Sequence, residues 1–128
     1  MKKLPVPLIA GVVTTLLVVG GIVYLAVTAK PAPSKYDDFA KCLTEKGAVF
    51  YGAFWCPHCQ AQKKAFGSSM QYVSYTECST SDGNAMLPVC KDKKIEGYPT
   101  WIFADGSRES GEVSMEKLAE KTSCTLPK

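Results

Sequence analysis

The chain has 128 residues, a formal net charge of +3, six cysteines and one histidine. That length corresponds to one domain of ordinary size. A single histidine excludes sites that need two imidazole groups, such as H-E-x-x-H protease sites and C2H2 zinc fingers. The segment 1–30 contains lysine but no acidic residue, whereas basic and acidic side chains are equal in number from residue 31 on. The larger part therefore has no basic excess for binding nucleic acid.

Residues 8–29 contain no charged side chain. As a helix they would span about 33 Å, enough to cross a bilayer core of about 30 Å. Lys2 and Lys3 precede this segment, so the positive-inside rule places residues 1–7 in the cytoplasm and the rest of the chain on the extracytoplasmic, periplasmic side. The alternative is a signal peptide cleaved after Val27-Thr28-Ala29, but a signal core is usually shorter. We therefore expect a single-pass, uncleaved anchor.

Residues 30–35 contain two prolines and are predicted to be an extended linker, followed by a soluble domain over residues 36–128. Hydrophobic periodicity and turn residues predict the elements of this domain in chain order. They are a helix capped by Ser34, a strand over 48–55, helices over 57–67 and 88–94 on either side of a strand over 71–78, a hairpin of strands over 100–104 and 107–113, and a helix capped by Ser114. This order predicts an α/β sandwich around a mixed sheet of about four strands. Its core is expected to include Tyr51, Phe54 and Trp101.

Cys56-Pro57-His58-Cys59 lies where the first predicted strand of the domain meets the following helix. Amide groups and the dipole at a helix N-terminus favour an anion, so Cys56 is predicted to be exposed and to act as the attacking thiolate. Cys59, one turn further along, is placed to form or resolve a disulfide. Pro57 suits the first helical turn, and His58 brings a potential positive charge that favours the reduced form. We assign catalysis to the two cysteines and redox tuning to Pro57 and His58.

Other uses of this motif fit the sequence less well. A c-type haem site needs histidine directly after the second cysteine, where this chain has Gln60. A zinc site could combine the motif with Cys78 and Cys90, but cysteines of exported domains usually oxidise. A purely structural disulfide within C-x-x-C would be strained and easily reduced. We therefore expect a redox pair, with no bound metal or cofactor.

Two segments carry a resemblance to a known family: Phe54-Trp55-Cys56-Pro57-His58-Cys59, and Tyr98-Pro99-Thr100 just before a predicted strand. By these residues the chain resembles the thioredoxin-like superfamily. In that superfamily a cis-proline stands opposite the active-site cysteines, and the adjacent backbone docks substrate as an added strand. The resemblance implies a cis bond before Pro99 and substrate binding by Tyr98, Pro99 and Thr100. Trp55 is a further candidate for substrate contact, with packing on the sheet as the alternative.

A longer set of residues extends the resemblance: Tyr51 to Cys59, Gln62-Lys63, Phe66-Gly67, Glu77-Cys78 and Gly97 to Trp101. Over about residues 36–124 the chain is similar to the thioredoxin-like domain fused to bacterial homologues of vitamin K epoxide reductase. In those fusions the domain passes electrons from substrate thiols to a membrane module that reduces quinone. The resemblance implies a separate vitamin K epoxide reductase-like or DsbB-like membrane partner here, with quinone reached only through it.

Two departures from cytosolic thioredoxins favour an oxidant. Those proteins carry a buried acid six residues before the first active-site cysteine, where it assists the resolving thiol during reduction, and this chain has Phe50 there. They also carry Gly-Pro between the cysteines, whereas the Pro-His of this chain is DsbA-like. The two classes differ widely in potential, at about −270 mV for thioredoxin and about −120 mV for DsbA.

The remaining cysteines, Cys42, Cys78, Cys90 and Cys124, allow three pairings. Cys78 and Cys90 flank a polar loop after a predicted strand, so a local bridge between them is the simplest pairing. By elimination Cys42 would then pair with Cys124 and tie the two ends of the domain together. A second redox relay at Cys78 and Cys90 is the alternative, but neither residue lies in a C-x-x-C motif or at a predicted helix N-terminus.

These observations lead to three hypotheses. The first is a membrane-anchored thiol–disulfide oxidoreductase that oxidises exported thiol-containing proteins and is reoxidised by a quinone-linked membrane partner. The second keeps the fold and reverses the electron flow, which gives a reductase or isomerase. The third is a non-enzymatic, disulfide-bridged interaction domain, which the intact C-x-x-C motif and Pro99 argue against.

Overall fold

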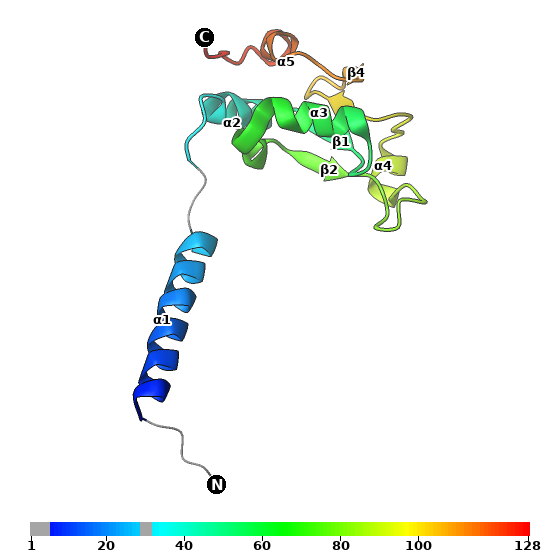
Figure 1. Ribbon diagram of the computed structural model, residues 1–128. Helices are drawn as coiled ribbons and strands as arrows, with labels where there is room; N and C mark the ends of the chain where they lie inside the picture. The colour runs from blue at the N-terminus through cyan, green and yellow to red at the C-terminus, as the bar shows by residue number, and fades with distance from the viewer. Residues whose placement is uncertain (1–5, 29–31) are drawn as a thin grey trace. The chain divides into compact units, whose positions relative to one another are not determined.

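A computed structural model describes residues 6–28 and 32–128 of the chain as two separate units that divide near residue 31 (Figure 1). The first unit is helix α1, Val6–Thr28. Its stretch Ala10–Thr28 is long and apolar enough to cross a membrane, and all of it is exposed. This helix corresponds to the predicted anchor over 8–29, of which Ala29 lies outside the described residues, as do the first residues of the linker.

The second unit is the predicted α/β domain, and its fold class is confirmed. Its elements are α2 (Asp37–Glu45), β1 (Val49–Gly52), α3 (Pro57–Phe66), the 3₁₀ helix η1 (Gly67–Tyr72), β2 (Tyr75–Glu77), α4 (Pro88–Asp92), β3 (Thr100–Ile102), β4 (Arg108–Ser110) and α5 (Met115–Thr122). The strands form one sheet in the order β2-β1-β3-β4, in which β1 and β2 are parallel and the other two pairs are antiparallel.

The sheet has a buried core on each face, because successive residues of a strand point to opposite sides. Phe50 of β1 belongs to the larger core, together with Phe39, Leu43, Phe66, Trp101 and Leu118 from α2, α3, β3 and α5. Its neighbour Tyr51 belongs to a smaller core on the other face, with Cys78, Cys90 and Ile95. The larger core also contains both cysteines of the C-x-x-C motif, so the motif is built into the hydrophobic interior.

The observed strands are shorter than predicted. The strand predicted over 48–55 ends at Gly52, and the chain then turns through 53–55 into α3. Of the strand predicted over 71–78, only Tyr75–Glu77 forms β2, because residues 71 and 72 belong to η1, which packs against α2 and α3. The partner strand predicted over 107–113 ends at Ser110, because Gly111 has a positive φ of 83° and turns the chain.

The helix boundaries show which capping signals the chain uses. Ser114 caps α5 as predicted, and its hydroxyl accepts a hydrogen bond from Lys117 N. The predicted cap Ser34 instead forms a turn before α2: its N–H donates to the Asp37 carboxylate, and its hydroxyl accepts from Tyr36 N. That helix therefore begins at Asp37 with Tyr36 as its N-cap, two residues later than expected.

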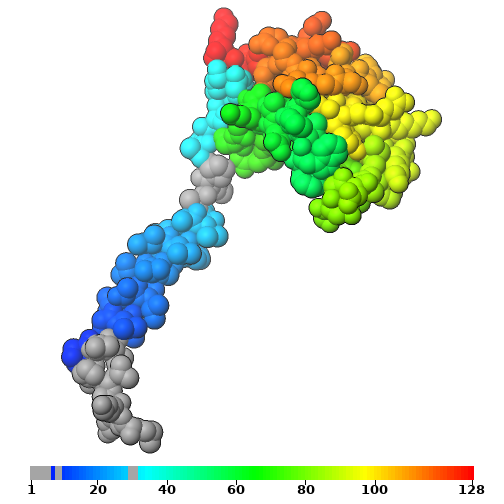
Figure 2. Space-filling model, turned by 45° about the vertical axis from the view of Figure 1, so that its right-hand side comes forward, coloured from blue at the N-terminus to red at the C-terminus, as the bar shows by residue number. Residues whose placement is uncertain are grey.

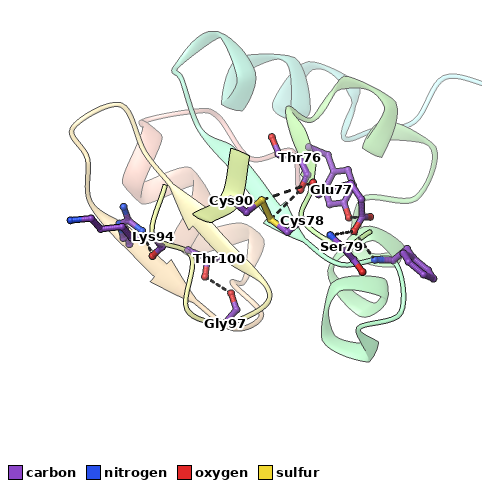
Figure 3. Close-up of a disulfide and its surroundings, with 11 residues drawn as sticks. Thr76, Glu77, Cys78, Ser79, Cys90, Lys94, Gly97 and Thr100 are labelled. Atoms are coloured by element: carbon purple, nitrogen blue, oxygen red, sulfur yellow. Dashed lines mark hydrogen bonds between the residues drawn. A yellow bond between two sulfur atoms is a disulfide. The ribbon is translucent and has the colours of Figure 1, made fainter. Parts of the chain in front are cut away.

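Two disulfides are present, and they join the pairs expected from the sequence. Cys42 of α2 is bonded to Cys124, which follows α5, so one bridge closes the two ends of the domain. Cys78 is bonded to Cys90, which links the end of β2 to α4 across the loop 79–87 (Figure 3). In the space-filling view, the part of the domain around residues 80–90 projects at one side of the body (Figure 2).

Candidate active site

The C-x-x-C motif begins helix α3. Cys56 is the N-cap residue with extended backbone, and Pro57 is the first helical residue, where a missing N–H costs nothing. Cys59 follows one turn later, and both thiols are unbridged. Cys56 is only 5% exposed, so the expectation of an exposed nucleophile was wrong. Its sulfur is covered because it packs in the larger core and lies 3.7 Å from the carbonyl oxygen of Tyr98.

Cys59 is fully buried behind Cys56. Burial raises the pKa of the Cys59 thiol to about 12, and its interactions with Cys56 add to the rise. Hydrogen bonding with the Ala53 backbone and the nearby charge of Lys63 act in the opposite direction. The two cysteines therefore have distinct roles, because Cys59 is held as a neutral thiol while Cys56 lies at the amide groups that open the helix.

A cluster of polar groups from β2 lies beside Cys59. The Tyr75 hydroxyl donates to the Glu77 carboxylate at 2.6 Å, and the N–H groups of Phe54 and Ser79 donate to its other oxygen. Partial burial opposes ionisation of Glu77, but these hydrogen bonds outweigh it and hold its pKa below the ordinary value. The ammonium of Lys63 lies 3.6 Å from the centre of the Tyr75 ring. Glu77 thus fixes the backbone just before the active-site helix, a role that the sequence alone did not reveal.

The Tyr98–Pro99 loop faces the motif. The peptide bond between these residues is cis. Tyr98 is partly exposed, whereas the side chains of Pro99 and Thr100 are buried. The Thr100 hydroxyl donates to Gly97 O at 2.8 Å and is turned into the loop. Of the three residues expected to bind substrate here, only Tyr98 therefore offers an accessible side chain.

Two aromatic side chains at the rim of the site are exposed. Trp55 is 48% exposed, its indole N–H donates to Ser79 Oγ at 2.8 Å, and its ring meets Tyr98 edge to face at 5.9 Å. Phe54 is 46% exposed, so its predicted place in the core was wrong, while Tyr51 and Trp101 are buried as expected. Phe54 is exposed because β1 stops at Gly52 and the following turn points outward.

The other predicted site residues include His58 and the pair Cys78 and Cys90. His58 is exposed on the first turn of α3, and its Nδ1 lies 2.6 Å from Glu112 Oε1. Cys78 and Cys90 are fully buried and bonded to each other, which leaves neither as a metal ligand (Figure 3). Within residues 6–28 and 32–128 no group of three or more His, Cys, Asp or Glu side chains could hold a metal ion. The pairing of Glu112 with His58 left no signal in the sequence, because 54 positions separate the two residues.

Comparison of the sequence with known proteins shows the family of the chain. The sequence profile described as Thioredoxin matches residues 29–125. The chain belongs to the thioredoxin family. It is also 36% identical over 135 residues to the "Thiol-disulfide oxidoreductase LTO1" of Arabidopsis thaliana, a match that covers 87% of this chain and 36% of the relative. The chain thus spans about a third of the length of that relative.

In this thioredoxin-family domain the buried thiol of Cys59 leaves no room for a side chain at Gly52. A Cβ atom on Gly52 would lie 2.9 Å from Cys59 Sγ and 3.2 Å from the Tyr75 ring. Overpacking of this kind costs about 1–3 kcal/mol, so Gly52→Ala should lower the free energy of unfolding by about 2 kcal/mol in urea titrations. Gly97→Ala is the matched control, because a Cβ atom there meets nothing within 4 Å. Equal stability of the two variants would contradict this packing.

The raised pKa of Cys59 predicts how its reactivity depends on pH. Only the thiolate attacks a disulfide, and pH 7 to 9 lies below a pKa of about 12. When Cys56 carries glutathione, Cys59 attacks the Cys56 sulfur and expels the glutathione thiolate. That release should become about tenfold faster per pH unit over this range. Lys63→Met should slow it about fivefold and Lys64→Met should not, as measured by quenched-flow mass spectrometry. A release rate independent of pH would refute this.

Proposed function

We propose that the chain is a membrane-anchored thiol–disulfide oxidoreductase that works outside the cytoplasm, mainly as an oxidase of exported proteins. The observation that carries the proposal is the pair Cys56 and Cys59, unbridged, one at the N-cap of α3 and one buried a turn later, in a thioredoxin-family domain. The name of the similar Arabidopsis protein supports the same reaction class.

The proposed reaction starts from the disulfide form of the pair. A substrate thiolate attacks Cys56 Sγ, the Cys56–Cys59 bond breaks, and Cys59 leaves and takes up a proton, as its high pKa favours. The second substrate thiolate then attacks the substrate sulfur of the mixed disulfide and expels Cys56 as a thiolate. The N-terminal amides of α3 stabilise this leaving group. Two electrons move from the substrate, which becomes a disulfide, to the pair, which becomes a dithiol.

Substrate docking is assigned to the rim of the site. Trp55 and Tyr98 present accessible aromatic surface next to Cys56. We assign Pro99 and Thr100 a contribution through backbone, because their side chains are buried. Aromatic surface of this kind suits an unfolded, exported chain, in which apolar side chains lie close to reactive thiols.

The oxidising direction rests on the Pro-His dipeptide and on Phe50, which stands where cytosolic thioredoxins have an acid. The runner-up is a reductase or isomerase, which the Lys63 charge beside Cys59 would serve by assisting its ionisation. Equilibration of the full chain with glutathione in detergent separates the two. A potential close to −120 mV is expected for an oxidase, and one close to −270 mV would defeat that direction.

We propose that α1 anchors the domain with the N-terminus inside, and that a vitamin K epoxide reductase-like or DsbB-like membrane protein reoxidises the pair and passes the electrons to quinone. Under this proposal quinone acts only through the partner. The apolar length of α1 and the lysines before it support the topology. Protease added to intact spheroplasts should digest the domain while the chain stays in the membrane fraction. Protection of the domain would reverse the topology.

A further inference from the structure

The three residues that follow β4 connect two parts of the active site. Gly111 N donates to Pro99 O at 2.8 Å, which ties this segment to the Tyr98–Pro99 loop. Val113 N donates to Gln62 Oε1 at 2.7 Å, and Gln62 Nε2 donates back to Val113 O at 3.1 Å. Gln62 lies on α3 and is buried, so these bonds are shielded from water. The segment 111–113 is therefore fixed at both ends against the active site.

Glu112 lies between these two fixed points, and its carboxylate reaches the first turn of α3. Its Oε1 lies 2.6 Å from His58 Nδ1. The two side chains are 70% and 49% exposed, for His58 and Glu112 respectively. Water weakens the attraction between such exposed groups. The short contact therefore depends on the backbone that holds Glu112 in place.

We propose that Glu112 is a positioning residue for the redox pair: it holds the His58 ring by Nδ1 on the first turn of α3 and supports the positive charge that His58 can present to the Cys56 thiolate. This inference rests on the proposed redox function. A positive charge on His58 stabilises the thiolate of the reduced pair, and a carboxylate paired with the ring stabilises that charge. The Cys56–Cys59 disulfide is then a stronger oxidant than it would be without Glu112.

The test is the equilibrium of the full chain with glutathione in detergent. The oxidised chain and two glutathione thiols exchange with the Cys56–Cys59 dithiol and one glutathione disulfide. Glu112→Gln keeps the size and an oxygen that accepts from Nδ1, but removes the charge. It should shift the equilibrium constant towards the oxidised chain by about two- to fivefold. Glu112→Asp keeps the charge and should stay closer to the wild type.

Two further variants test whether Glu112 changes the equilibrium constant through the His58 ring. In a His58→Gln background, Glu112→Gln should leave the constant unchanged, because Glu112 acts through the ring. Glu109→Gln is the matched control, since its carboxylate lies 3.2 Å from Lys117 and 3.3 Å from Lys121. It should behave as wild type.

Three outcomes would count against the inference. A wild-type constant for Glu112→Gln would overturn it alone, and so would an equal shift in the His58→Gln background. If the wild-type chain did not exchange with glutathione at Cys56 and Cys59, the proposed function would fail and this inference with it.

Discussion

Replacing Cys59 by alanine should convert a transient intermediate into a stable product. In this variant Cys56 can form a mixed disulfide with a substrate, but the buried thiol that would release it is gone. The variant is mixed with a protein that contains a disulfide. Its Cys56 thiolate attacks one sulfur of that disulfide and forms the mixed disulfide, while the other sulfur leaves as a thiolate. Non-reducing electrophoresis should show covalent complexes joined through Cys56, and catalytic turnover should fall by at least about a thousandfold.

The control for this experiment is a substitution of the other cysteine of the pair. Cys56→Ala should give no complex, because the remaining thiol of the pair is buried and held neutral by its high pKa. Complexes that form equally well with Cys56→Ala would show that another residue attacks. A Cys59→Ala variant that captures no protein disulfide would contradict both the oxidase and the reductase hypothesis.

Removing the Cys42–Cys124 bridge should have the largest effect on stability. The bridge joins residues 82 positions apart, so it restricts the unfolded chain far more than a local bridge does. The loop-entropy relation gives about 4.5 kcal/mol for a loop of this length and about 3 kcal/mol for the 12-position loop of Cys78–Cys90. The double variant Cys42→Ala/Cys124→Ala should therefore lose more stability than Cys78→Ala/Cys90→Ala.

Unfolding of the full chain in urea, followed by tryptophan fluorescence, measures this order directly. Trp101 is fully buried in the larger core and reports loss of that core, whereas Trp55 is already exposed at the site. The reverse order of the two double variants would show that the short bridge does more than close its loop. Glutathione exchange at Cys56 should survive in both variants under conditions where they remain folded.

Much of the fold follows from local signals in the sequence. Signals that lie within a few residues of each other correctly predicted several helices and their ends. They are the apolar run of α1, the Ser114 cap of α5, and Pro57 and Gly67 at the two ends of α3. The strand ends were less predictable, because they depend on distant partners. The apolar spacing of 71–78 indicated a strand, but part of it serves the packing of η1 against α2 and α3.

For the candidate site, too, local features were predictable and contacts between distant residues were not. The sequence placed Cys56 and Cys59 at a helix start, since strand, proline and helix signals are adjacent in the chain. It did not reveal that Cys56 is covered, because the covering carbonyl belongs to Tyr98, 42 positions away. Glu77 and Glu112 were missed for the same reason, because they contact Phe54 and His58 across 23 and 54 positions of the chain, and these contacts exist only in the folded domain.

The most direct test of the proposed function is a single turnover with cysteine mapping. The oxidised full chain is mixed with an excess of a reduced, unfolded protein, quenched in acid, alkylated and analysed by mass spectrometry. We expect one substrate disulfide for each chain, with Cys56 and Cys59 alkylated and the other four cysteines still bridged. An unchanged substrate, or alkylation at Cys78 and Cys90 in place of the pair, would contradict the proposal.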